Sequence, residues 1–285
     1  MKYGAHIYLW MDRWSDASLP LLDKAAGLGL DYVELAAGDD VHFTPAPTRR
    51  RAEELSLDLV MSPGGLWPVD CDISSPEQSH RRKGVTWHKG ILDLCGELGA
   101  MAYAGAIYGH PGTVDRSRPP HECHAWAAEG LYELAAYAAE RGVRLVIEPM
   151  SRFRTHVVNT PEQALHLIGL ADHPNLGVLF DTWHMLNEVR DYGAAVRACG
   201  ERLWGVHACG SDRGLPGGDL VPWDALFGAL AGIGFDGHVA LETYNTSIPG
   251  FARSRGMFQD LCPDGDEFVR RGMAFLKEKE GKSEV

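Results

Sequence analysis

Several features that mark other protein classes are missing from this chain. No stretch comes near the roughly 18 consecutive apolar residues of a membrane span, and no GxGxxG or GxxxxGK[ST] motif follows an apolar run. Basic residues are scarce: 27 Lys and Arg face 39 Asp and Glu, a net charge of −12, which argues against a nucleic acid or an anionic membrane as the main partner. The six cysteines form no CxxC pair and the N-terminus has no signal-peptide run, so we expect reduced thiols and a cytoplasmic location.

Short apolar runs, most of them followed by a stretch with helical spacing, organise the 285 residues. The runs predict strands at 5–10, 30–36, 57–62, 100–108, 143–148, 176–181, 203–208 and 238–243. The stretches predict helices at 18–29, 90–99, 125–142, 160–171, 189–200 and 223–234. Continuously apolar strands are typical of a parallel sheet covered on both faces. We therefore expect one (β/α)8 TIM barrel over 1–285, with a frayed polar tail at about 277–285; a doubly wound open sheet is the alternative.

Local signals add detail to this barrel. Thr160 precedes Pro161 and fits an N-cap with proline at the first helical position. The longest connections follow the third, fourth, seventh and eighth strands, at 63–78, 109–120, 209–222 and 244–266. In a barrel all four lie at the C-terminal face, where barrel enzymes carry their active sites.

Four consecutive strands finish on a side chain that can bind a metal: Glu148, Asp181, His207 and Glu242. Neighbouring strand ends converge at one mouth of a barrel, so we expect these side chains to share a centre. Three carboxylates would repel one another there, and a divalent cation is the natural remedy. Each residue alone is better explained as a cap, an ion pair or a core histidine. The set of four favours a metal site, and its oxygen-rich donors suit Mn²⁺, Mg²⁺ or Co²⁺.

Other polar and aromatic side chains are expected at the same face. They are His184, Arg213, Trp67, Tyr108, His110, Trp10, Trp14 and Glu34, all at strand ends or in the loops that follow. Aromatic rings around a polar site are suited to covering a sugar or polyol. For Trp10 and Tyr108, packing in the top of the barrel core is an equally good interpretation.

Five segments resemble one known family. EPMSRF (148–153), LFDTWHM (179–185), VHACGSDR (206–213), VPWDALFGALAGIGFDGHVALE (221–242) and GMFQDL (256–261) are similar to the ketose 3-epimerases of the xylose-isomerase-like barrel superfamily, above all to the D-tagatose/D-psicose group. The resemblance spans nearly the whole chain. It implies a dimer or tetramer that binds one divalent metal, Mn²⁺ first among the candidates, through Glu148, Asp181, His207 and Glu242.

The resemblance also implies residue roles. Glu148 and Glu242 would be the acid/base pair, while His184 and Arg213 would contact substrate oxygens. The implied reaction is isomerisation or epimerisation of a ketose or keto-sugar derivative by proton transfer through a metal-stabilised cis-enediolate. Carboxylates on opposite sides of the substrate can take a proton from one face and return one to the other.

One position departs from the family. Six residues after Glu148 the family carries a carboxylate, whereas this chain has Arg154. A guanidinium prefers a carboxylate, a phosphate or a carbonyl-rich partner, so Arg154 is a candidate substrate contact that argues against a free ketohexose. Alternatively, it pairs with a nearby acidic residue of the protein.

Three other functions remain open at this point. The first is a lyase on the same scaffold, such as a keto-cyclitol dehydratase or a 3-keto-glycoside eliminase. The second is an apurinic-site endonuclease, which the negative net charge and the single four-ligand set disfavour. The third is a non-catalytic ligand-binding barrel.

Overall fold

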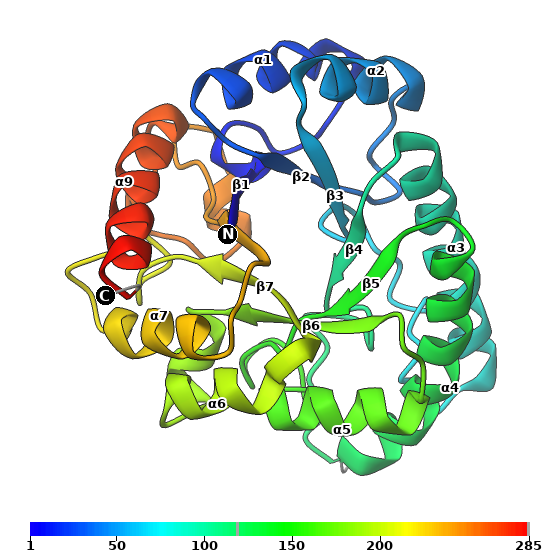
Figure 1. Ribbon diagram of the computed structural model, residues 1–285. Helices are drawn as coiled ribbons and strands as arrows, with labels where there is room; N and C mark the ends of the chain where they lie inside the picture. The colour runs from blue at the N-terminus through cyan, green and yellow to red at the C-terminus, as the bar shows by residue number, and fades with distance from the viewer. Residues whose placement is uncertain (118–119, 284–285) are drawn as a thin grey trace.

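Eight parallel strands close into a barrel in the order β1-β2-β3-β4-β5-β6-β7-β8, surrounded by helices (Figure 1). The computed structural model describes residues 1–117 and 120–283. Direct pairing of β8 with β1 confirms the predicted TIM barrel and excludes the open sheet. Among the described residues, no helix combines the length and apolar composition needed to cross a bilayer.

The strands are β1 (Lys2–His6), β2 (Tyr32–Ala36), β3 (Asp58–Ser62), β4 (Ala102–Gly105), β5 (Arg144–Ile147), β6 (Leu176–Asp181), β7 (Leu203–Ala208) and β8 (His238–Leu241). The α-helices are α1 (Pro20–Gly27), α2 (Pro45–Leu55), α3 (Gln78–Leu98), α4 (Pro120–Ala139), α5 (Pro161–Ala171), α6 (Tyr192–Cys199), α7 (Trp223–Gly232), α8 (Phe251–Ser254) and α9 (Gly265–Ser283). All eight predicted strands are present, although several are shorter than expected.

The first strand shows why some observed strand boundaries differ from the predicted ones. It was expected at 5–10 but ends at His6, because the His6 ring accepts a hydrogen bond from the backbone N–H of Tyr8 and starts a 3-10 turn over Ile7–Leu9. At α5 the predicted cap is confirmed: the Thr160 hydroxyl accepts from the N–H of Gln163, whose side chain in turn accepts from the N–H of Thr160.

Three helical segments differ from expectation. Helix α2 was not predicted, because five of its eleven residues are charged and only Thr48 and Ala52 are buried. Helix α3 begins twelve residues before the expected start at 90, with a polar and largely exposed first half. The frayed tail is wrong for residues 277–283, which continue α9. Residues 284–285 of that tail, and 118–119 of the loop at 109–120, lie outside the described residues.

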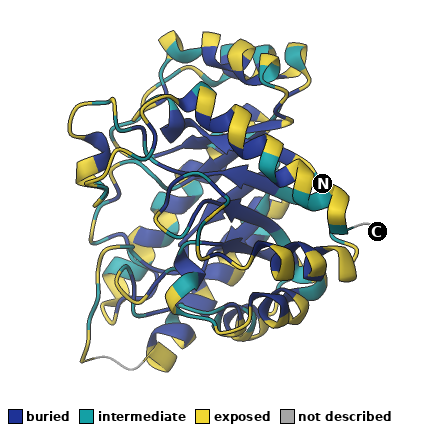
Figure 2. Ribbon diagram, turned by 90° about the vertical axis from the view of Figure 1, so that its left-hand side faces the viewer, coloured by how far each residue is buried: buried dark blue, intermediate teal, exposed yellow. Residues whose placement is uncertain are grey.

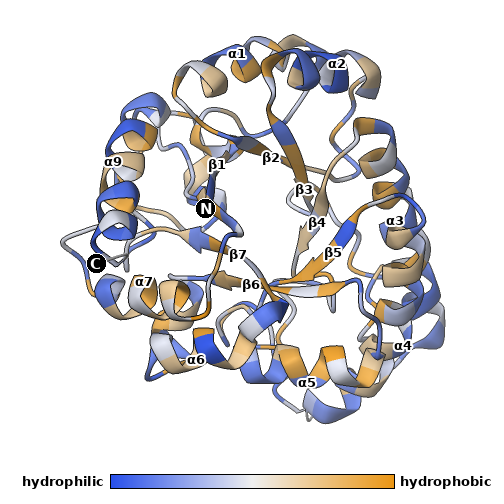
Figure 3. Cartoon of the chain, viewed as in Figure 1, coloured by the Kyte–Doolittle hydropathy of each residue, from blue (hydrophilic) through white to orange (hydrophobic). Residues whose placement is uncertain are grey.

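Apolar side chains fill two separate spaces. A large cluster packs the outer faces of the strands against the helices, and a small one fills the barrel interior with Tyr32, Val60, Ala102, Ala104, Val146, Leu179 and Ala240. Figures 2 and 3 show buried, mostly hydrophobic strands inside a ring of helices whose exposed faces are more polar. The six cysteines are buried, as expected.

Candidate metal centre and substrate cavity

The alternation of side chains along the strands positions the candidate site. Residues of the small interior cluster are followed two positions later by acids: Tyr32 by Glu34, Val146 by Glu148, Leu179 by Asp181 and Ala240 by Glu242. A residue two positions on faces the same side and lies about 6.6 Å further along the strand. The apolar layer therefore carries a layer of acids above it, at the C-terminal mouth. Figure 2 shows this mouth with its long loops on the left, opposite the N-terminus.

Glu148, Asp181, His207 and Glu242 converge at this mouth. One ligand atom from each lies within 4.8 Å of all the others, and all four residues are buried. The register pairs Asp181 with His207 on adjacent strands. The structure thus brings together the four residues that the sequence singled out.

The histidine is oriented by an acid from across the barrel. His207 Nε2 donates to Oε2 of Glu34 at 2.9 Å, so Nδ1 points at the cluster, 2.6 Å from Oε2 of Glu242 and 3.6 Å from Oε1 of Glu148. Burial lowers the pKa of His207, but Glu34 and Glu242 outweigh it and raise the pKa well above its usual value. A positive charge is favoured at this point.

The residues present fit a divalent cation. His207 Nδ1 and Glu242 Oε2 are buried without an aligned hydrogen-bond partner among the described residues, although they face each other. A cation between them would satisfy both atoms and displace the proton from Nδ1. Three carboxylates and one imidazole form a hard donor set. Glu34 would then be the outer partner that holds the imidazole in place.

Arg213 supplies a second positive charge in contact with the cluster. Its Nη1 lies 2.5 Å from Oδ2 of Asp181 and its Nη2 lies 2.8 Å from Oε1 of Glu242. Arg213 is 2% exposed, and its backbone has a positive φ of 70°, within the loop that follows β7. The predicted substrate contact is therefore engaged by two of the candidate metal ligands.

The two glutamates differ in acidity. Burial raises the pKa of Glu148 to about 7, against an opposing effect of His207. Burial acts in the same direction on Glu242, but Arg213 and His207 outweigh it and hold the pKa of Glu242 well below its usual value. One carboxyl group can hold a proton near neutral pH while the other stays ionised. That division suits an acid and a base on one substrate.

A small cavity of about 80 Å³ opens above the cluster. Glu148, His207 and Glu242 form part of its wall. Of the predicted substrate contacts, Arg154 alone lines the cavity. The sequence analysis missed His6, Tyr8, Tyr244 and Arg255, which also line it. Their signal was weak: His6 and Tyr8 lie within the apolar run predicted as the first strand, and the others belong to the connection after β8.

Two aromatic candidates have packing roles instead. Tyr108 is fully buried, and its hydroxyl donates to the carbonyl oxygens of Glu148 (2.9 Å) and Val158 (3.1 Å). Trp10 donates from its indole nitrogen to Oδ1 of Asp266 at 2.7 Å. Neither lines the cavity, so both match the core interpretation.

Trp67 and His110 also lie outside the cavity lining. Trp67 is buried, donates to the carbonyl of Cys71 and stacks on Trp87 with ring centroids 5.1 Å apart. His110 Nε2 donates to the carbonyl of Trp67 at 2.9 Å. These contacts join the loops after β3 and β4 into one wall, so the two residues support the mouth rather than face it.

His184 and Arg154 are the remaining predicted substrate contacts, and Arg152 lies in the same loop as Arg154. His184 is buried, accepts at Nδ1 from the N–H of Ser151 and has a pKa lowered by burial to about 4. Arg152 holds the loop after β5 through a two-point ion pair with Glu188. Arg154 has no side-chain hydrogen bond or ion pair with any residue that the structure describes. The expected alternative, pairing with a nearby acid, is not found there.

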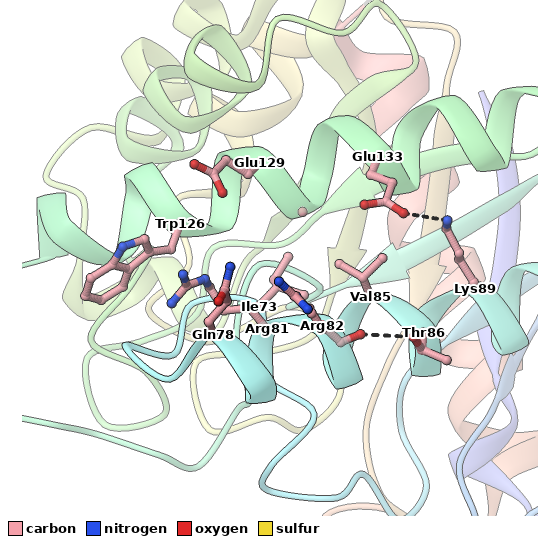
Figure 4. Close-up of a pocket in the computed structure, with 11 residues that line it drawn as sticks. Ile73, Gln78, Arg81, Arg82, Val85, Thr86, Lys89, Trp126, Glu129 and Glu133 are labelled. Atoms are coloured by element: carbon pink, nitrogen blue, oxygen red, sulfur yellow. Dashed lines mark hydrogen bonds and ion pairs between the residues drawn. The ribbon is translucent and has the colours of Figure 1, made fainter.

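A second groove, of about 390 Å³, lies between α3 and α4 on the outer wall (Figure 4). Lys89 pairs with Glu133 across it at 2.6 Å, and the guanidinium of Arg81 lies 5.3 Å from the ring of Trp126. The groove shares no lining residue with the cavity at the mouth. The contacts of Lys89 and Arg81 are packing interactions between α3 and α4.

The closed barrel and the acid cluster at its mouth define a (β/α)8 protein with a candidate divalent-metal centre. Residues 22–279 match the family described as xylose isomerase-like TIM barrel, so the chain belongs to that family. Its full-length relatives include ketose 3-epimerases. An L-ribulose 3-epimerase from Methylomonas sp. (strain DH-1) is 28% identical, covering 98% of each chain. A ketose 3-epimerase from Arthrobacter globiformis is 29% identical, covering 98% of this chain and 96% of its own.

Solved structures agree with these relatives. A D-allulose 3-epimerase from Methylomonas sp. in complex with D-allulose has a TM-score of 0.90 at 28% identity, covering 98% of this chain and 97% of that one. The bound D-allulose belongs to that protein.

Proposed function

We propose that this protein is a metal-dependent epimerase that inverts carbon 3 of a ketose or keto-sugar derivative. The observation that carries the proposal is the pair Glu148 and Glu242: two buried carboxyl groups on the wall of one cavity, both within the four-residue cluster that can hold a metal ion. The ketose 3-epimerases that share the full length of the chain support the same reaction.

The residues of the site have distinct roles in this reaction. Glu242, ionised, takes the proton from the carbon next to the carbonyl, and Glu148, protonated, delivers one to the opposite face; in the reverse direction the roles exchange. A divalent ion held by Glu148, Asp181, His207 and Glu242 would supply electrophilic stabilisation of the negative charge that develops on the substrate oxygens. Arg213 keeps Glu242 ionised, and Glu34 orients His207.

Proton exchange at carbon 3 tests this proposal. The Mn²⁺-loaded protein is incubated in D₂O with a panel of ketoses and keto-sugar derivatives, and NMR follows loss of the C3–H signal and formation of the epimer. Glu148→Gln and Glu242→Gln should each remove exchange, whereas the exposed control Glu97→Gln should not. Absence of exchange with every compound, or exchange that survives chelation, would contradict the proposal. A product lighter by one water would instead establish the dehydratase alternative.

The proposal extends to metal, assembly and location. Mn²⁺ is proposed as the resident ion because the donor set holds three oxygens and one nitrogen. A homodimer or homotetramer is proposed because loops at the mouth expose large apolar side chains, among them Val69 (74%), Leu220 (79%) and Phe258 (82%). We also propose a cytoplasmic location. Metal analysis and light scattering of the purified protein test the first two.

A further inference from the structure

Arg255, on the loop after α8, is held at the cavity by neutral groups. Its Nη2 donates to the carbonyl of Gly64 at 2.5 Å and to the hydroxyl of Tyr8 at 3.1 Å. Its guanidinium carbon lies 5.2 Å from the ring centroid of Tyr8, 5.8 Å from that of Phe251 and 5.9 Å from that of Tyr244. No carboxylate pairs with Arg255 in the described part of the chain. The protein therefore orients this cation without neutralising it.

Arg154 lines the same cavity from the loop after β5. It too has no acidic partner among residues 1–117 and 120–283. Both arginines line the cavity together with Tyr244, and the guanidinium of Arg255 lies over the Tyr244 ring. Two guanidiniums without an acidic partner in the described part of the chain thus line one cavity, one from the loop after β5 and one from the loop after α8.

The charges around the cavity leave a positive excess. Glu34, Glu148, Asp181 and Glu242 contribute at most four negative charges, and Arg213 balances one of them. A divalent ion would balance two more. The two positive charges of Arg154 and Arg255 then exceed the one negative charge that remains. A neutral ketose presents nothing that would compensate this excess, whereas a charged group on the substrate would.

We propose that the substrate is an anionic keto sugar, and that Arg255 and Arg154 bind its carboxylate or phosphate. Guanidinium groups match both oxyanions through paired, charge-assisted hydrogen bonds. The anionic end lies toward the two arginines, and the carbonyl end lies toward Glu148 and Glu242. This proposal rests on the proposed epimerase function, since it names the substrate class of the same site.

Binding of unreactive polyols tests the charge preference without depending on turnover. Calorimetry of the Mn²⁺-loaded protein compares sorbitol, gluconate and sorbitol 6-phosphate, which share a chain but differ in charge. At least one anion should bind at least about tenfold more tightly than sorbitol, because a hydrogen bond to a charged group is worth about 1.5–3 kcal/mol. Tighter binding of gluconate would indicate a carboxylate on the substrate, and tighter binding of sorbitol 6-phosphate would indicate a phosphate.

Variants separate the arginines from the metal, which can itself attract an anion. Arg255→Gln and Arg154→Gln should each reduce the anion-to-sorbitol ratio by about tenfold, and Arg154→Glu should reduce it further. The control Arg253→Gln, an exposed arginine of α8, should leave the ratio unchanged. Circular dichroism checks the fold, and Arg255→Lys, which keeps the charge, should retain part of the preference.

Two results would overturn the inference: equal affinity for the three polyols, or a preference that survives both glutamine substitutions. If Arg255→Gln does not fold, the Arg154 variants decide. An anion preference without C3 exchange on any compound would remove the epimerase function but leave the charged subsite. Exchange at carbon 3 of neutral ketoses without any anion preference would support the epimerase function and remove the charged subsite.

Discussion

Glu34 Oε2 lies 2.9 Å from His207 Nε2, and this buried contact directs the other ring nitrogen, Nδ1, at the acid cluster. The pair joins β2 to β7 across the barrel. Replacing the carboxylate with a neutral amide weakens the hydrogen bond that orients the imidazole, so Glu34→Gln should weaken Mn²⁺ binding by about 10- to 100-fold. Titration of the metal-free variant with Mn²⁺ measures this. Unchanged affinity, with Glu97→Gln as the reference, would show that Glu34 does not support a metal ligand.

Removal of the metal should lower thermal stability. A ligand present at 100 times its dissociation constant stabilises the folded state by about 2.7 kcal/mol, which corresponds to a rise in Tm of about 4 °C for a chain of this size. Calorimetry with Mn²⁺ and with a chelator should show that difference. Asp181→Asn, which alters one of the four ligands, should abolish most of it. A Tm that does not respond to Mn²⁺ in the unmodified protein would contradict the metal centre.

Tyr108 is predicted to be structural. Tyr108→Phe removes a hydroxyl that donates to the carbonyls of Glu148 and Val158. The Val158 carbonyl keeps the N–H of Met150 as a donor, and loss of the buried hydrogen bond to the Glu148 carbonyl costs about 1–3 kcal/mol. Urea unfolding should show that loss, while KM for the substrate changes less than about twofold. A large change in KM at unchanged stability would restore the substrate-contact interpretation.

Buried His88 should make the protein sensitive to acid. Burial lowers its pKa from 6.5 to about 3, so between these values the unfolded state binds a proton that the folded state does not. Stability contributed by neutral His88 is therefore present above pH 6.5 and is lost as the pH falls toward 3, by about 2 kcal/mol at pH 5. His88→Gln should flatten the dependence of unfolding free energy on pH. The exposed His42→Gln should not, and equal slopes for the two variants would refute the assignment.

The convergence of the three acids and the histidine could be predicted because strand geometry determines it. Glu148, Asp181 and His207 each lie at or next to the end of a strand, and parallel strand ends meet at one mouth whatever the loops do. The cavity wall could not be predicted in the same way. Tyr8 and Arg255 reach it from segments far apart in sequence, and no local pattern distinguishes them from other loop residues.

Aromatic candidates were misleading for a related physical reason. Tyr108, Trp67 and Trp10 have both a large apolar surface and one polar atom, which suits a sugar site and a barrel rim equally well. Their polar atoms are used by backbone carbonyls or a neighbouring acid, which only the folded contacts reveal. Helix α2 was missed because its surface position needs almost no apolar residues.

The pairing of β8 with β1 has a consequence for the newly made chain. Tyr8 precedes its partner Arg255 by 247 residues and is synthesised before it. The barrel cannot close until β8 has left the ribosome, and the cavity cannot acquire that wall until Arg255 has followed. Helices and strands in between can form earlier, but the cavity is completed only after both have emerged.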